Sequence, residues 1–203
     1  MRKRPHRNRV TAQGEIVADT ARGLFMGNRG ILHDATGHIG NALWRHKAWI
    51  ICTLVWKDWH RDIMQPGAYT ELFFLDEAVA MAAGHRPCAL CRRPAFNAYK
   101  TAADHVGSAH ELDTQLQSER AIPRRFLQKR HTCPIESIPS GAIVLYENAP
   151  ALVFEDALFP VSLSGYGKPY SKPTDGDILV LTPPTSMTAL RAGYRPMLHP
   201  SLS

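Results

Sequence analysis

The sequence is poor in cysteine, in aromatic residues and in long apolar runs. Its 203 residues include four cysteines, and aromatic residues make up 8% of the chain. Four cysteines are too few for the disulfide framework that holds many small secreted domains together. No apolar run approaches the roughly 20 residues that a helix needs to cross a bilayer, and the arginine-rich first residues are not followed by the apolar segment of a secretory signal. We therefore expect a cytoplasmic protein without a membrane partner.

Familiar catalytic motifs are also missing from the sequence. It contains neither a GxGxxG fingerprint nor a P-loop, the two glycine-rich patterns that cradle phosphates. No serine–histidine–aspartate arrangement and no pair of catalytic carboxylates can be read from it. The sequence therefore assigns no catalytic residue and leaves open whether the protein is an enzyme.

Acidic residues are outnumbered by basic ones, and the excess is unevenly distributed. The net charge is +6; residues 1–10 carry five basic residues and no acidic one, and residues 86–130 carry nine basic and four acidic residues. Residues 11–85 and 131–203 each carry two more acidic than basic residues. Basic segments of this kind either attract polyanions such as nucleic acid or serve as solvated surface. The side chains expected to contact phosphates are Arg92, Arg93, Arg124, Arg125, Lys129 and Arg130.

The most informative motif is a pair of cysteines, Cys88 and Cys91, separated by two residues. The pair follows Gly84 and Pro87, which are typical of the end of a helix. In a reducing compartment such a pair indicates a metal site or a redox site. A thioredoxin-like redox motif would follow a strand, whereas this pair follows a predicted helix. The spacing therefore favours two thiolate ligands to one tetrahedral ion, for which zinc is the usual occupant.

A structural zinc ion needs four ligands, so two more must come from elsewhere in the chain. Cys52 is the best third ligand, because it lies on a predicted strand; the alternative is a buried cysteine with no ligand role. We expect His33 as the fourth, since it lies in a glycine-rich segment beside Asp34, which would orient its imidazole. The remaining alternatives for the fourth ligand are His60, His85 and Cys133.

Apolar patterns and turn residues predict short elements along the whole chain. The expected strands are residues 14–19, 48–56, 69–75, 142–146, 151–154, 158–163 and 177–181. The expected helices, caps included, are residues 76–83, 90–105, 108–120 and 183–192. Asp76 and Ser108 are the predicted N-caps. The five glycines within 21–41 predict a long loop.

Residues 70–93 resemble a known zinc-binding domain. The segment Phe73-Phe74-Leu75-Asp76-Glu77-Ala78-Val79-Ala80-Met81-Ala82-Ala83-Gly84-His85-Arg86-Pro87-Cys88-Ala89-Leu90-Cys91 is similar to the second half of the metal-binding domain of the Ada methyl phosphotriester repair family. The shared pattern is an aromatic strand, a short helix with Glu-Ala and Ala-Ala-Gly, and then Arg-Pro-Cys-x-x-Cys. The resemblance implies a zinc site at Cys88 and Cys91 and a protein that handles DNA.

The sequence departs from this family upstream of the strand. The family has two cysteines there, separated by three residues, whereas this chain has the single Cys52. The role of a methyl-accepting thiolate is therefore not carried over. Because Cys52 lies within the apolar run 48–56, we expect it to be a buried structural ligand.

These features predict an α+β fold, in which an Ada-like zinc module with a helical segment packs against a small antiparallel β-rich C-terminal lobe. The expected parts are a disordered basic tail (1–12), the zinc-binding domain with basic helices (13–131) and the β-rich lobe (132–203). The expected function is a zinc-stabilised nucleic-acid-binding protein, with DNA as its partner, in repair or processing. The alternatives are a metal-dependent or thiolate enzyme that acts on DNA by phosphodiester hydrolysis or alkyl transfer, and a zinc-structured protein-interaction module.

Overall fold

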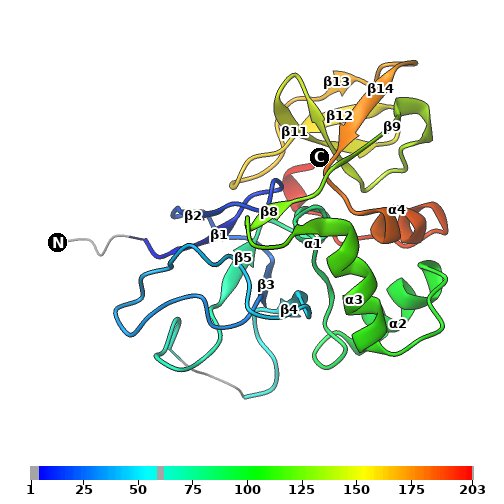
Figure 1. Ribbon diagram of the computed structural model, residues 1–203. Helices are drawn as coiled ribbons and strands as arrows, with labels where there is room; N and C mark the ends of the chain where they lie inside the picture. The colour runs from blue at the N-terminus through cyan, green and yellow to red at the C-terminus, as the bar shows by residue number, and fades with distance from the viewer. Residues whose placement is uncertain (1–4, 59–61, 203) are drawn as a thin grey trace.

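The computed structural model describes residues 5–58 and 62–202 and combines helices with two six-stranded sheets, which confirms an α+β fold (Figure 1). The first sheet has the strand order β2-β1-β5-β3-β4-β6. Its strands are β1 (Arg7–Val10), β2 (Ile16–Ala18), β3 (Phe25–Asn28), β4 (Ile50–Thr53), β5 (Leu72–Phe74) and β6 (Arg86–Pro87).

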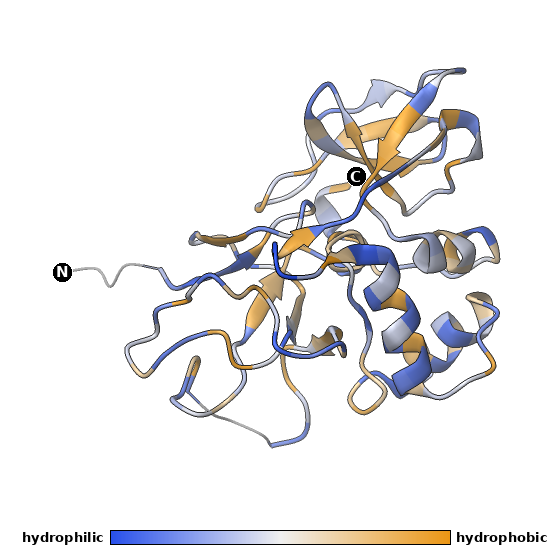
Figure 2. Ribbon diagram, viewed as in Figure 1, coloured by the Kyte–Doolittle hydropathy of each residue, from blue (hydrophilic) through white to orange (hydrophobic). Residues whose placement is uncertain are grey.

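The second sheet is antiparallel and has the order β13-β12-β11-β10-β14-β9. Its strands are β9 (His131–Pro134), β10 (Ile143–Tyr146), β11 (Ala149–Phe154), β12 (Ala157–Pro160), β13 (Tyr170–Ser171) and β14 (Asp177–Val180). A small hairpin, β7 (Ala121–Ile122) and β8 (Leu127–Gln128), precedes it. The meander predicted from the short apolar runs is confirmed, and Figure 2 shows these strands as largely hydrophobic.

The helices are α1 (Glu77–Ala82), α2 (Arg93–Ala102), α3 (Ala109–Arg120) and α4 (Pro184–Arg191), with 3-10 turns at Ile135–Ser137 and Pro200–Leu202. The predicted cap of α3 is confirmed as a capping box, in which Ser108 and Glu111 bond each other's backbone N–H. Helix α2 begins later than predicted, with Pro94 in its first turn. No described helix has the length and the apolar character to span a membrane.

Helix α1 is fixed at both ends by the residues that the sequence indicates. Oδ1 of Asp76 accepts a hydrogen bond from the Val79 N–H at 2.9 Å, as an N-cap does. Oδ2 of the same carboxylate accepts the hydroxyl of Tyr166. Gly84 ends the helix with a φ of 86°, and a Cβ at this position would lie 2.7 Å from the Arg120 side chain. The helix therefore stops just before β6 and the two cysteines.

The C-terminal segment returns to the start of α1. The carboxylate of Glu77 accepts the Tyr194 hydroxyl at 2.5 Å and the Met197 N–H at 2.9 Å, and the Glu77 N–H donates to the Met197 carbonyl at 3.1 Å. The N–H of His199 donates to Asp76 at 3.0 Å. Figure 1 shows the chain end between the two sheets, near α1. Residues far apart in the sequence are thus joined at one helix N-terminus.

Three expectations are corrected by the first sheet and the hairpin. Residues 7–10, expected within a disordered tail, form β1, which pairs with β2 and β5 and buries Val10 completely. The segment 21–41, expected as a loop, contains β3. The basic segment after Pro123, expected as part of the basic helices, contributes β8 to the hairpin.

The two sheets do not have separate cores. One cluster of buried apolar side chains includes Val10 and Ile51 from the first sheet, Leu112 from α3, and Val144 and Val180 from the second sheet. A second cluster joins α1 residues such as Val79 to the second sheet. The cysteine-bearing sheet and the β-rich lobe therefore pack as one body.

Candidate metal centre

The predicted cysteine trio comes together in space. One ligand atom from each of Cys52, Cys88 and Cys91 lies within 4.8 Å of the other two, which is close enough for all three to hold one metal ion. Cys52 lies in β4, and the parallel pairing of β4 with β6 sets Ile51 opposite Pro87. The Cys88 N–H then donates to the Ile51 carbonyl at 2.9 Å. The strand pairing therefore holds Cys88 beside Cys52.

The turn after β6 completes the trio. The Leu90 N–H donates to the Cys88 sulfur at 3.4 Å, and the Arg92 N–H donates to the Cys88 carbonyl at 3.2 Å. This turn presents Cys91 before α2 begins at Arg93. Backbone N–H groups directed at sulfur stabilise a thiolate. The local fold thus supplies both the positions of the three sulfurs and part of the electrostatic support for their charge.

The three thiols also interact with one another. Hydrogen bonds from the Cys52 and Cys91 thiols lower the pKa of Cys88 well below its ordinary value. The same hydrogen bonds, together with burial, raise the pKa of Cys52 far above its ordinary value. A soft divalent cation replaces the shared protons and lets all three sulfurs become thiolates. The donor set therefore fits zinc in charge and in chemical type.

The sulfurs border a cavity of about 320 Å³. Cys88 is buried, whereas Cys52 and Cys91 are partly exposed. The other residues around the cavity are mainly apolar: Met26, Asn28, Ile50, Thr53, Leu54, Trp56, Tyr69 and Leu90. Leu54 and Leu90 are 50% and 64% exposed. Within the apolar run 48–56, Trp49 and Ile51 are fully buried, whereas Cys52 is partly exposed and Leu54 and Val55 are exposed, because β4 ends at Thr53 and the chain then leaves the core.

His33 does not join the cysteines. The side chain of His33 is buried. Its Nδ1 lies 2.6 Å from Oγ1 of Thr70 and its Nε2 lies 3.1 Å from the Gln65 carbonyl, so both ring nitrogens already have hydrogen-bond partners. Asp34 bonds the Thr36 and His38 N–H groups of its own turn and does not contact the imidazole within the described bonds.

Two of the other candidates for the fourth ligand also lie elsewhere. His85 is fully buried, with Nδ1 at 3.2 Å from the Ala80 carbonyl and Nε2 at 3.2 Å from Nε of Arg29. Cys133 lies on β9 of the second sheet. His60 lies outside the described residues. The described part of the chain thus gathers three metal ligands, all of them cysteine sulfur.

The predicted phosphate-contacting residues divide into two groups. Arg92 is buried, forms an ion pair with Glu77 at 2.9 Å and lies over the Phe25 ring. Arg130 is partly buried and donates to Gln128 and Gln13. The residues that remain exposed are Arg93, Arg124, Arg125 and Lys129. Arg92 is thus a structural residue, because its charge is neutralised inside the protein.

The hairpin segment that carries the exposed basic residues also carries an aromatic residue, Phe126, that the sequence did not single out. The Phe126 ring packs edge-on against Trp44, with the ring centroids 4.9 Å apart, and both side chains are partly exposed. We call Trp44, Phe126, Arg124, Arg125 and Lys129 the hairpin surface. The dipeptides Trp44-Arg45 and Arg125-Phe126 are the sequence signal for it, because aromatic rings next to arginines are typical of surfaces that bind nucleic acid.

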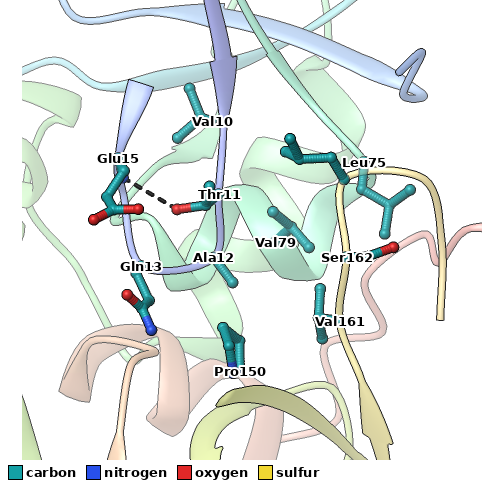
Figure 3. Close-up of a pocket in the computed structure, with 11 residues that line it drawn as sticks. Val10, Thr11, Ala12, Gln13, Glu15, Leu75, Val79, Pro150, Val161 and Ser162 are labelled. Carbon is teal, nitrogen blue, oxygen red and sulfur yellow. Dashed lines mark hydrogen bonds between the residues drawn. The ribbon is translucent and has the colours of Figure 1, made fainter. Parts of the chain in front are cut away.

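A separate cavity of about 290 Å³ lies where the first sheet meets the second (Figure 3). The turn between β1 and β2 borders it on one side, where the Glu15 N–H donates to Oγ1 of Thr11 at 3.2 Å. Most of its other walls are apolar, with Leu75 and Val79 from the α1 region and Val161 just after β12. It brings together no ligand cluster and carries no chemistry comparable to that of the cysteine site.

No protein-family model, no curated protein and no solved structure matches this chain.

Proposed function

We propose that the protein is a zinc-stabilised nucleic-acid-binding protein, with a role in DNA repair or processing. The observation that carries the proposal is the convergence of Cys52, Cys88 and Cys91 within 4.8 Å. Three clustered thiolates would repel one another without a cation, and zinc is the common partner for such a set. Because the ligands come from β4 and from the turn after β6, the ion would join two parts of the first sheet that are distant in sequence.

The hairpin surface supports the nucleic-acid part of the proposal. Arg124 and Arg125 are exposed in the turn of the hairpin, and Phe126, the next residue, packs against Trp44. Exposed cations attract phosphates, and aromatic rings offer faces for base stacking. Nearby Lys129 adds a third exposed cation, although its ammonium also donates to the Ser118 carbonyl at 2.7 Å.

Metal analysis of the purified protein tests the zinc centre. We expect one zinc ion per chain in the wild type and a loss of stoichiometric zinc in Cys88→Ser. Cys133→Ser is the matched control, because Cys133 is a partly exposed cysteine on the second sheet and should leave zinc unchanged. Wild-type protein free of metal, or equal zinc in both variants, would contradict the proposal.

Binding measured across salt concentrations tests the hairpin surface. The variant Arg124→Glu with Arg125→Glu should weaken binding to DNA of any sequence and flatten the dependence on salt. Lys168→Glu with Lys172→Glu changes the net charge by the same amount on the second lobe and should bind as the wild type does. An equal loss of DNA affinity in the two double variants would show a general effect of net charge, and the hairpin surface would then have no specific role in binding.

A thiolate enzyme is the second candidate, and the cavity beside the cysteines favours it. Cys52 and Cys91 are partly exposed and border the cavity of about 320 Å³, so an electrophile has a route to sulfur. In an alkyl transfer from a methyl phosphotriester, a sulfur–carbon bond forms, the carbon–oxygen bond breaks and a phosphodiester anion leaves. Mass spectrometry of cysteine peptides after incubation with methylated DNA tests this candidate. A stoichiometric methyl adduct would support it, and unmodified peptides would leave Cys52 as a structural ligand.

A further inference from the structure

A second pocket, of about 450 Å³, lies next to the hairpin and contains none of the cysteines. Arg29 and Arg130 line it together with Trp44, Phe126, Leu127 and Gln128. We call it the arginine pocket. Its volume lies within the range of small-molecule sites, which is about 300–1,000 Å³. It therefore offers room for a ligand of moderate size between two guanidinium groups and two aromatic rings.

Arg29 is fully buried and has no acidic partner among the described bonds. Its guanidinium donates to Nε2 of His85 at 3.2 Å and to the carbonyls of Gly14 and Ala83 at 3.3 Å each. The Trp49 ring lies 4.3 Å from the guanidinium carbon. All these partners are neutral, and a guanidinium has five N–H donors to satisfy. The imidazole and the carbonyls therefore solvate the charge of Arg29, but no carboxylate among these partners neutralises it.

Arg130 adds to this uncompensated charge. It donates to Oε1 of Gln128 at 2.8 Å and to the Gln13 carbonyl at 2.6 Å, and both of these acceptors are neutral. Burial, together with the charges of Arg120 and Arg130, lowers the pKa of Arg29 to about 9. Glu15 also borders the pocket, but its side chain is exposed. The pocket wall therefore carries net positive charge.

Two other buried arginines have carboxylate partners, whereas the buried Arg120, like Arg29, donates only to neutral groups among the described bonds. Arg29 differs from Arg120 because it lines the arginine pocket. Arg86 pairs with Asp113 at 2.8 Å, and Arg92 pairs with Glu77 at 2.9 Å. A buried charge without a counter-charge is costly, so its retention needs a compensating benefit. An anion that enters the arginine pocket would supply the missing counter-charge, and its apolar part would cover Trp44 and Phe126.

We propose that the arginine pocket binds a nucleoside monophosphate, either free or as the phosphorylated 5′ end of a single strand. The phosphate contacts Arg130 and lies in the field of Arg29, and the base packs against Phe126 and Trp44. Phosphate suits a guanidinium because it accepts several charge-assisted hydrogen bonds, and a nucleoside adds a base that can stack on the rings. The inference extends the nucleic-acid part of the proposed function to a defined ligand, and it does not depend on the zinc centre.

Calorimetric titration of the full-length protein with AMP, adenosine and inorganic phosphate tests the inference. AMP should bind at least about tenfold more tightly than adenosine, because a charge-assisted hydrogen bond contributes enough for such a difference. AMP should also bind more tightly than inorganic phosphate, because the rings add stacking. Equal affinity for AMP and adenosine, binding of phosphate alone, or no binding of AMP would overturn the inference.

Variants locate the site and separate it from the hairpin surface. Arg130→Gln should weaken AMP binding about tenfold or more, whereas Lys168→Gln should have no effect. Arg130 is partly exposed, so its replacement is less damaging to the fold than replacement of Arg29. An unchanged AMP affinity in folded Arg130→Gln would contradict the assigned pocket. Duplex DNA binding that is lost in the Arg124 and Arg125 variant but kept in Arg130→Gln would show that duplex DNA and AMP depend on different cations, although Trp44 and Phe126 belong to both sites.

Two short strands that differ only in a 5′ phosphate distinguish the two sources of the ligand. If the phosphorylated strand binds more tightly than both AMP and the unphosphorylated strand, and AMP competes with it, the ligand is a strand end. If AMP binds more tightly than either strand, the ligand is a free nucleotide. If the two strands bind equally and AMP does not compete, the arginine pocket does not recognise a 5′ phosphate and the inference is wrong.

Discussion

The two sheets differ in what they bury. Up to Arg120 the described chain buries charged side chains repeatedly, at Arg29, Glu71, Asp76, Glu77, Arg86, Arg92, Asp113 and Arg120. From residue 121 to 202 no charged side chain is buried, and the interior is built from apolar residues such as Val144, Leu152 and Leu158. The first half therefore depends on specific partners for its charges, and the second half depends on apolar burial.

This difference also separates function from scaffold. The cysteine trio and the buried ion pairs draw on the first sheet and the helices that follow it, whereas the arginine pocket lies where Arg29 meets the hairpin and the second sheet. The strands of the second sheet follow one another as short hairpins, from β10 to β13. Changes of metal, charge or pH should therefore act mainly on the first half, whereas a loss of apolar volume should act on the second.

Removal of the metal should have the largest effect. Structural zinc sites contribute on the order of 10 kcal/mol to folding. We expect a chelator to abolish hydrogen-exchange protection in β4 and β6 before β11 and β12 lose theirs. Equal loss of protection in both sheets would remove the distinction between the two halves.

Breaking a buried ion pair should cause the second-largest loss of stability. Asp113→Ala leaves the Arg86 guanidinium buried without its carboxylate, which normally costs about 3–5 kcal/mol. Denaturant unfolding would measure the loss. As a control, replacement of both residues by apolar ones of similar volume should cost less than the single change, because no buried charge is left unpaired.

A cavity in the second sheet should lower the free energy of unfolding somewhat less than the loss of the buried ion pair does. Leu152→Ala removes a fully buried side chain from β11, and such changes cost about 2–5 kcal/mol. Zinc content should stay at the wild-type level, because Leu152 belongs to the cluster between α1 and the second sheet. A loss of zinc in this variant would show that the two halves do not respond separately.

The smallest expected effect is a dependence on pH through His85. Burial and the nearby charges of Arg29 and Arg120 hold the pKa of His85 well below 6.5 in the folded protein. The unfolded chain therefore binds a proton that the folded chain does not, and stability falls as pH drops below about 6.5, by up to about 1.4 kcal/mol per pH unit. His85→Gln should remove this contribution. Parallel stability curves for the two proteins between pH 6.5 and 5 would contradict the prediction.

Local signals in the sequence predicted the local parts of the structure. Asp76, Ser108 and Gly84 mark helix ends through contacts within a few residues, and each was identified. The three cysteines were also identified, because a Cys-x-x-Cys pair needs further ligands and Cys52 was the cysteine on a predicted strand.

Long-range pairing accounts for what the sequence did not predict. Strand β1 pairs with β5, and β3 lies between β4 and β5, so the partners of both strands are distant in the chain. His33 had the right chemistry for a ligand, but Thr70 and Gln65, on another part of the chain, engage its ring. The count of basic residues likewise could not separate Arg92, which is paired inside, from Arg124, which is exposed.

The bonds between the C-terminal segment and α1 have a consequence for biosynthesis. A ribosome releases Asp76 and Glu77 long before Tyr194, Met197 and His199, which later satisfy the two carboxylates. During that interval the start of α1 lacks the bonds that these three residues supply. The nascent chain therefore reaches its final packing late in translation, and a stop codon that removed residues after 193 would leave Asp76 with Val79 and Tyr166 and Glu77 with Arg92, but without the bonds that the C-terminal segment adds.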